Sequence, residues 1–119
     1  MKDQSDKMYL TPAERIVMRT IWLADHQLVL HEVMNICNEE YKKNWKPQTV
    51  STYLSHLVQK EFLKMHRQGR YCYYEPLISR EEFLLYDVKS IAHFWQLEEE
   101  RLLEYIKTFS TNPLTFSAE

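Results

Sequence analysis

The side chains best suited to bind a ligand are concentrated in one stretch, residues 42–70. Seven basic residues fall there against Glu61 alone, a balance of +6. Because the whole chain carries −2, the remaining residues sum to −8. A basic segment on an otherwise acidic chain is either an ordinary solvated surface or the footprint of a polyanion. The seven are Lys42, Lys43, Lys46, Lys60, Lys64, Arg67 and Arg70.

Within this stretch, residues 47–61 have the pattern of an amphipathic helix that begins at Pro47. Its apolar residues recur at intervals of three and four, which predicts one buried stripe. The opposite face carries small hydroxyl and amide side chains, where a purely structural helix usually has Glu and Lys. Such side chains can hydrogen-bond base edges and phosphates. The apolar set is Val50, Tyr53, Leu54, Leu57 and Val58, and the opposite face is Gln48, Thr49, Ser51, Thr52, Ser55, His56 and Gln59.

Two β-inclined runs, 62–67 and 71–75, follow this helix and predict a hairpin that ends at Pro76. The only glycine of the chain, Gly69, lies between them. We expect it at the hairpin tip, the one place where the chain demands a positive φ. Aromatic side chains in the second run could stack on single-stranded bases, but cross-strand packing is the favoured interpretation. These aromatic residues are Tyr71, Tyr73 and Tyr74.

The elements that must position this segment lie on its N-terminal side. Thr11 to Glu14 combines an N-cap hydroxyl, a proline and a capping-box glutamate, and predicts a helix from there to about residue 24. The apolar run 28–30 predicts a short strand or buried link, and a second helix is expected from His31 to about Tyr41. Its inward side chains are Val33, Met34, Ile36 and Cys37, and Trp22 and Trp45 are expected to be core or core-edge anchors.

On the C-terminal side, residues 79–82 form a second capping box, and a long helical pattern follows. Residues 98–101 mark either a solvated face of that helix or a break between two helices. The apolar side chains are too numerous for a helix lying against so small a domain, which favours a dimer interface over a helix folded back on its own core. The expected interface residues are Phe83, Val88, Ile91, Phe94, Trp95, Leu102, Leu103, Ile106 and Phe109.

The order of elements predicts a mainly α fold with a small β-hairpin: a winged helix-turn-helix over residues 1–78, followed by C-terminal dimerisation helices over 79–119. In such a fold the third helix lies in the major groove and the hairpin contacts the DNA backbone or minor groove. The alternative is a winged-helix adaptor that binds protein and no specific DNA. The expected DNA contacts are Lys46, Gln48, Thr49, Ser51, Thr52, His56, Lys60, Arg67, Gln68 and Arg70.

Composition excludes other classes of protein. A single glycine cannot build a dinucleotide-binding turn or a phosphate-cradling loop. The histidines and cysteines lack metal-ligand spacing, and Cys37 and Cys72 are expected to be buried small apolar residues. We therefore expect no enzymatic activity, no metal and no cofactor. Without a long apolar run, the chain is expected to be soluble and cytoplasmic, with no membrane partner.

Residues 9–95 resemble the penicillinase and methicillin-resistance repressors, which have copper-responsive repressors as cousins. The resemblance implies a homodimeric repressor on a palindromic operator, with C-terminal helices as the dimer interface. The matching stretches are Leu10-Thr11-Pro12-Ala13-Glu14, Val17-Met18, Ile21-Trp22, Glu32-Val33, Trp45-Lys46-Pro47-Gln48-Thr49-Val50, Leu54, Leu57, Lys60 and Gly69-Arg70-Tyr71-Cys72-Tyr73-Tyr74-Glu75-Pro76.

The chain departs from the family pattern at residues that affect DNA sequence preference more than the fold. Leu30 and Lys46 replace residues with capping hydroxyls, so we expect weaker caps on the second and third helices. His56 stands where an arginine is common on the third helix, and Lys60-Glu61 replaces Lys-Gly.

Regulation also departs from the family pattern. The cysteine-rich tail of the copper-responsive members is absent, which disfavours copper sensing. The Asn-Phe pair at which penicillinase repressors are cut is absent too, since the comparable helix reads Leu103-Glu104-Tyr105-Ile106. The sequence therefore leaves the operator, the inducing signal and any regulatory protease partner open.

Overall fold

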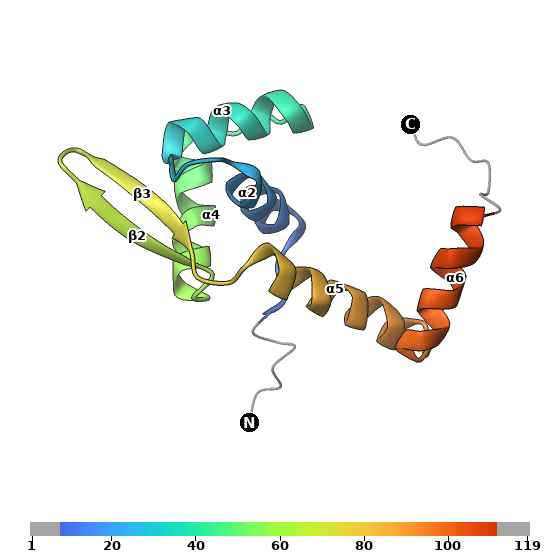
Figure 1. The fold of residues 1–119 in the computed structure, drawn as a ribbon. Coiled ribbons are helices and arrows are strands. Elements are labelled where there is room, and N and C mark those ends of the chain that lie inside the picture. Colours follow the sequence, from blue (N-terminus) through green and yellow to red (C-terminus); the bar gives the residue numbers. More distant parts are fainter. Residues whose placement is uncertain (1–7, 112–119) are drawn as a thin grey trace. The chain divides into compact units, whose positions relative to one another are not determined.

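The computed structural model describes residues 8–111, and its order of elements confirms the predicted mainly α fold with a small β-sheet (Figure 1). The chain divides into a first unit that runs through Phe83 and a second that begins at Leu84, beyond the expected boundary at residue 78. The elements are α2 (Pro12–Leu23), β1 (Leu28–Val29), α3 (Leu30–Tyr41), α4 (Pro47–Gln59), β2 (Leu63–Gln68), β3 (Tyr71–Pro76), α5 (Arg80–Phe94) and α6 (Glu99–Thr111).

Helix α2 begins at the predicted capping box. The Thr11 hydroxyl accepts a hydrogen bond from the Glu14 backbone N–H at 3.2 Å, and the Thr11 N–H donates to the Glu14 carboxylate at 3.0 Å. The second capping box is present as well, because Ser79 and Glu82 exchange the same pair of bonds at 3.0 Å each. Both local predictions are confirmed.

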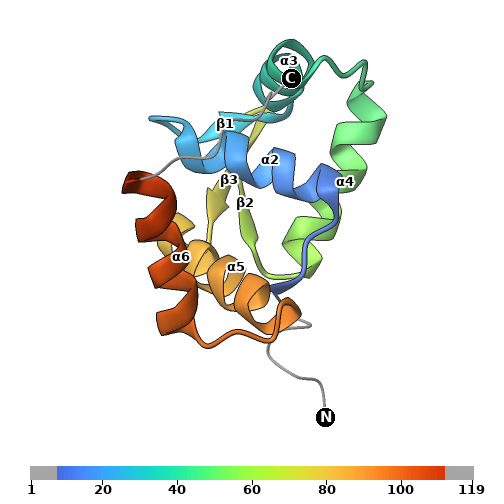
Figure 2. The same ribbon diagram turned by 90° about the vertical axis from the view of Figure 1, so that its right-hand side faces the viewer.

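The core of the first unit lies where α2, α3 and α4 pack against one another, and the strands lie behind α2 in Figure 2. Helix α4 contributes the predicted stripe, with Val50, Leu54 and Leu57 fully buried. Tyr53 is half-buried, and Val58 is exposed, contrary to the prediction, because it lies at the margin of the stripe in the last turn. The other fully buried side chains include Val17, Met18, Leu28, Val33, Cys37, Phe62 and Leu63.

The cysteines differ from each other. Cys37 is buried as expected, and burial raises the pKa of its thiol. Cys72 is only half-buried, so the prediction of a buried residue is wrong there. It lies on β3 opposite Arg67, near the hairpin end, where less of the core covers the strand.

The three strands form one antiparallel sheet in the order β1-β3-β2. Strands β2 and β3 and the loop Gly69-Arg70 between them form a hairpin, hereafter the wing, which projects to one side of α4 (Figure 1). Gly69 has a φ of +63°, as predicted for the tip. Tyr74 is buried between Leu28 and Met65, which confirms cross-strand packing for this residue, whereas Tyr71 at the tip is exposed.

The prediction that the hairpin tip is the one place with a positive φ is wrong, because three other residues within 8–111 also have positive φ values. Lys42, Glu61 and Gln96 have φ values of 55°, 63° and 56°, and each directly follows a helix or its cap. After α4, the Phe62 N–H bonds to the Leu57 carbonyl at 2.9 Å and the Glu61 N–H to the Val58 carbonyl at 3.0 Å. This is the Schellman end of a helix, which glycine usually occupies.

Two substitutions are expected to change stability in opposite directions for the same reason. Glu61→Gly removes the Cβ that disfavours the left-handed conformation, and is expected to stabilise the protein by about 1 kcal/mol. Gly69→Ala adds that strain where a Cβ meets no atom within 4 Å, and is expected to destabilise by about 1 kcal/mol. Urea unfolding of both variants measures the changes, with Ser55→Gly inside α4 as a control that should destabilise. An unchanged Glu61→Gly variant would contradict the strain argument.

The aromatic contacts of α5 correct one interface prediction. Phe83 is only 5% exposed and packs against Trp22 and Phe62, with ring centroids 5.4 and 5.9 Å away. The Trp22 indole N–H donates to the Ile78 carbonyl at 2.8 Å, which anchors the entry to α5. Phe83 therefore belongs to the core of the first unit, because the first turn of α5 completes that core.

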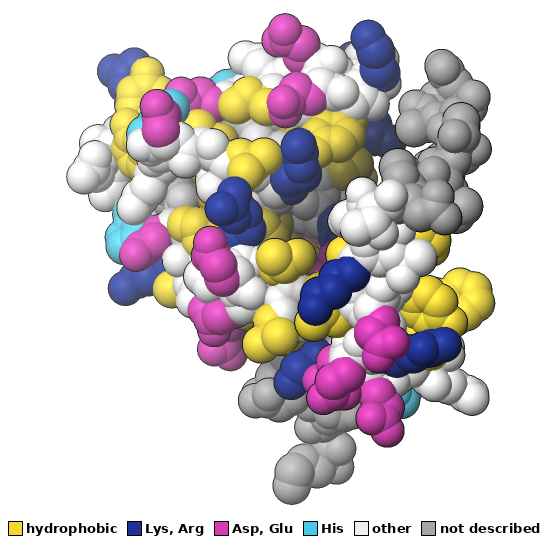
Figure 3. All heavy atoms as spheres, turned by 45° about the vertical axis from the view of Figure 1, so that its right-hand side comes forward, with side chains coloured by type: hydrophobic (Ala, Val, Ile, Leu, Met, Phe, Trp, Pro, Cys, Tyr) yellow, Lys and Arg dark blue, Asp and Glu magenta, His cyan; other side chains and the backbone are white. Residues whose placement is uncertain are grey.

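The second unit consists of α5 from Leu84 onward and of the whole of α6, and a break separates the two helices. The break lies at Gln96, where the Leu97 N–H bonds to the Ala92 carbonyl at 2.8 Å and closes α5. Of the two interpretations of residues 98–101, the break between helices is confirmed. No residue of α6 is buried in the part of the chain that the structure describes. Figure 3 shows one face of the molecule, on which hydrophobic side chains reach the surface between charged ones.

Candidate nucleic-acid interface

The outward face of α4 carries a single stripe of exposed polar side chains. Gln48, Thr52, Ser55 and Gln59 follow one another at intervals of four, three and four residues, opposite the buried Val50, Leu54 and Leu57. Of the predicted contacts on α4, Gln48, Thr52 and His56 are exposed, whereas Thr49 and Ser51 are half-buried at the margins. Ser55 and Gln59 were not among the predicted contacts, although their helical spacing from Thr52 and Gln48 places them on the same stripe.

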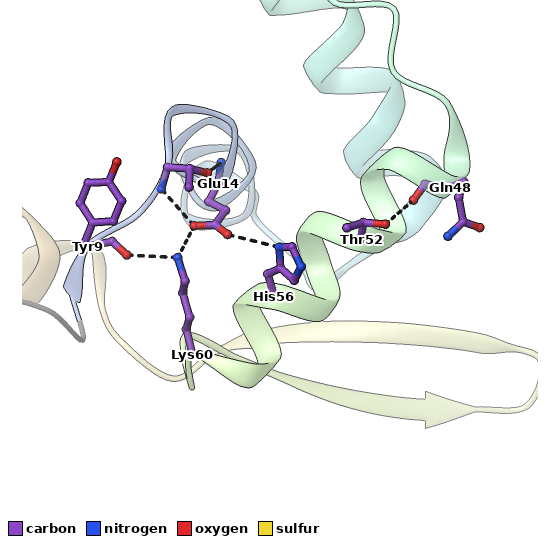
Figure 4. Close-up of polar contacts among 7 residues, drawn as sticks. Tyr9, Glu14, Gln48, Thr52, His56 and Lys60 are labelled. Carbon is purple, nitrogen blue, oxygen red and sulfur yellow. Dashed lines mark hydrogen bonds and ion pairs between the residues drawn. The ribbon is translucent and has the colours of Figure 1, made fainter.

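The hydrogen bond of Thr52 limits what its side chain can offer a ligand. Its hydroxyl donates to the Gln48 carbonyl at 3.0 Å (Figure 4). The hydroxyl proton is therefore used within the helix, which leaves the oxygen lone pairs and the methyl group for a ligand. An acceptor beside a methyl group suits the amino groups of adenine and cytosine and the methyl group of thymine.

The N-terminus of α4 is held in place by the residues before it. The Asn38 amide donates to the Trp45 carbonyl at 3.0 Å and accepts from the Trp45 N–H at 2.9 Å. The Trp45 ring packs edge-on against Tyr53, with centroids 5.0 Å apart, which confirms its predicted role as an anchor. Sequence reasoning did not single out Asn38, because its partner lies across a connector and no spacing rule joins them.

The first turn of α4 has the weak cap that was expected. Lys46 is the N-cap residue, and its side chain makes no capping hydrogen bond. The first-turn N–H groups, including those of Gln48 and Thr49, therefore lack a side-chain acceptor. Such N–H groups, together with the helix dipole, favour an anion such as a phosphate.

The wing presents cations that have no carboxylate partner within residues 8–111. Lys64, Arg67 and Arg70 are exposed and form no ion pair there. Gln68, also predicted as a contact, is exposed next to the tip, opposite Tyr71. Exposed cations without partners can neutralise phosphates and release counterions.

Lys60 differs from the other predicted cations. Its ammonium group donates to the Glu14 carboxylate at 2.5 Å and to the Tyr9 carbonyl at 3.3 Å (Figure 4). His56 Nδ1 lies 3.7 Å from the other Glu14 oxygen. Burial opposes ionisation of Glu14, but the hydrogen bonds from Lys60 and Thr11 outweigh it, so the pKa of Glu14 is lowered. The ion pair thus contributes stability above the pKa of an unfolded glutamate, and this contribution is lost as the pH falls through the lowered value.

Two other histidines, His26 and His66, contact carboxylates of the first unit. His66 contacts Glu75 across the wing at 2.5 Å, and His26 bridges Asp25 and Glu32 at 2.8 and 3.2 Å. The hydrogen bond to Asp25, and to a lesser extent the one to Glu32, raises the pKa of His26.

Among residues 8–111, no group of three or more histidine, cysteine or acidic side chains is arranged to hold a metal ion.

A core of three helices whose third helix exposes a polar stripe, followed by a basic hairpin, defines a winged helix-turn-helix protein. The family model described as penicillinase repressor matches residues 10–114, and the chain belongs to this family. The penicillinase repressor of Bacillus licheniformis is 33% identical to it over 86 residues, which are 68% of this chain and 59% of the relative. The chain thus spans less than two thirds of the length of that curated relative.

Two solved structures have the same fold. The monomeric form of Bacillus licheniformis BlaI, in complex with the blaP half-operator, has a TM-score of 0.52 and 30% identity, covering 62% of this chain and 87% of that one. The DNA-binding domain of the repressor BlaI has a TM-score of 0.55 and 29% identity, covering 69% and 93%. Within the part of this chain that the structure describes, no helix has the length and apolar character needed to cross a membrane.

Proposed function

We propose that this protein is a cytoplasmic, sequence-specific DNA-binding repressor that acts as a homodimer on a palindromic operator and occludes a promoter. The observation that carries the proposal is the exposed polar stripe of α4, flanked by a helix N-terminus without a side-chain cap and by wing cations that form no ion pair within residues 8–111. The likeness to a BlaI structure solved with a half-operator supports it.

Each part of this surface has a role in the proposed complex. The α4 stripe enters the major groove and reads base edges with its hydroxyl and amide groups. Lys46 and the first-turn N–H groups of α4 hold a phosphate. Arg67 and Arg70 place the wing on the adjacent backbone, which adds affinity that depends on salt.

The dimer is proposed from the exposed apolar side chains of the second unit. Phe94 and Trp95 are 75% and 67% exposed, which is costly for aromatic rings in water. A second copy of the chain would cover such side chains and supply the two-fold symmetry that a palindrome requires. Of the predicted set, Ile91, Leu103, Ile106 and Phe109 are also exposed, while Val88 and Leu102 are half-buried; Leu84, Leu85 and Tyr105 are exposed apolar residues that the prediction did not include.

Salt titration of duplex binding tests the proposal. Log affinity should fall linearly with log salt for the wild type, and Arg67→Gln/Arg70→Gln should reduce the slope by about 1.8, at about 0.9 for each lost phosphate contact. Fluorescence anisotropy of a labelled duplex at several salt concentrations measures this.

The matched control is Arg80→Gln/Arg101→Gln, which removes the same charge from two arginines outside the wing that pair with Glu81 and Glu104. Its slope should equal that of the wild type. Negligible wild-type binding at low salt would refute the repressor and favour the protein-binding adaptor.

A further inference from the structure

The carboxylate of Glu14 connects the start of α2 to the end of α4. Its side chain is 3% exposed, and its Oε1 accepts hydrogen bonds from the Thr11 N–H and from the Lys60 ammonium group. Its Oε2 faces His56 Nδ1. Figure 4 shows Lys60 and His56 reaching from α4 toward this one carboxylate.

The charge of Lys60 is used inside the protein. Besides Glu14, the ammonium group bonds to the Tyr9 carbonyl and lies 5.8 Å from the centroid of the Tyr9 ring. Two of its three N–H donors are therefore engaged by the protein. Lys60 is also the C-cap residue of α4, so the ion pair with Glu14 attaches the C-terminal end of this helix to the start of α2.

Helices α2 and α4 also pack against each other, and each contributes buried apolar side chains to the core. Apolar side chains resist separation of two helices, but they specify axial position and rotation less strictly than a hydrogen-bonded ion pair does. Base contacts tolerate misplacement of only about 0.5 Å or 10–20°. The Glu14 contact therefore fixes the axial position and rotation of α4, on which the alignment of the polar stripe with the base edges depends.

We propose that Glu14 is a positioning residue of the DNA-binding surface: through Lys60 and His56 it sets the orientation of α4, and Lys60 makes no phosphate contact. The inference rests on the proposed DNA-binding function. In this proposal Lys60 and the side of α4 that carries His56 hold α4 in position against α2.

The test compares Lys60→Met, Glu14→Met, the double variant and Lys60→Arg. The double variant keeps the net charge of the chain and replaces the ion pair by an apolar pair, whereas Lys60→Arg keeps the ion pair. Each is measured for thermal midpoint, for the salt slope of duplex binding, and for the ratio of operator to non-operator affinity. Lys46→Met is the control, since Lys46 is exposed and forms no ion pair within residues 8–111.

We expect both single variants to have lower thermal midpoints, because each leaves one charge without its partner. The double variant should recover only part of the lost midpoint, because it has no unpaired charge but still lacks the capping-box bond from the Thr11 N–H. It should keep the wild-type salt slope, but its operator discrimination should stay lower by about tenfold, the value of one good base contact. Lys60→Arg should match the wild type in all three. Lys46→Met should keep the midpoint and lose about 0.9 from the slope.

Two outcomes would overturn the inference. A slope lowered by about 0.9 in the folded double variant would show that Lys60 contacts a phosphate. Full operator discrimination in that variant, or lost discrimination in Lys60→Arg, would show that the ion pair does not orient α4. Failure of the wild type to bind any duplex would instead refute the proposed function.

Discussion

Phe94→Glu/Trp95→Glu is expected to make the protein monomeric and to weaken its binding to a palindromic operator by about 10²–10⁴-fold, the gain that linked binding sites supply. The two rings are the most exposed aromatic side chains of the described second unit and pack edge-on at 5.2 Å. Carboxylates at both positions would put four like charges into a two-fold interface, where unpaired charge is strongly disfavoured.

Sedimentation and operator titration together measure this effect. The wild type should sediment as a dimer and prefer the full palindrome to a single half-site, whereas the variant should bind both duplexes with similar, weak affinity. The matched control is Leu77→Glu, because Leu77 is an apolar residue of the first unit that is 50% exposed. A variant that stays dimeric, with unchanged operator affinity, would place the interface elsewhere.

Phe62→Ala is expected to remove about 3–5 kcal/mol of stability, the cost of deleting a buried aromatic side chain. Phe62 is the largest fully buried side chain among the described residues and links α4, the wing and the first turn of α5. Its own N–H and carbonyl bond to Leu57 and Leu77. Small domains have a total free energy of unfolding of only about 5–15 kcal/mol. The variant should therefore lose a large fraction of its stability and unfold at a lower urea concentration.

Urea unfolding followed by circular dichroism measures the loss. Tyr71→Ala is the matched control, since it deletes an aromatic side chain that is 55% exposed, and it should change stability by at most about 0.5 kcal/mol. Equal losses in the two variants would contradict the placement of the core around Phe62.

Several elements of the fold could be predicted because their signals are local. The capping boxes at Thr11 and Ser79 each join residues three apart, and the hairpin tip is specified by one glycine. The buried stripe of α4 repeats within a single helix. Such features depend on backbone geometry over a few residues, so the sequence alone contains them.

Helix ends were less predictable. Glu61 and Gln96 adopt the left-handed conformation that usually signals glycine, so nothing local marks them as helix-ending residues. The surrounding hydrogen bonds and packing impose that conformation at a cost. The break between α5 and α6 could therefore be stated only as one of two alternatives.

The sequence by itself determined the order of elements, the buried stripe of α4 and the concentration of cations in residues 42–70. Only the tertiary structure decided how individual side chains are used: Lys60 pairs with Glu14, Phe83 completes the core of the first unit, and Asn38 holds Trp45. The physical reason is that charge and hydrophobicity are properties of a residue, whereas pairing and burial are properties of the neighbours that folding brings to it.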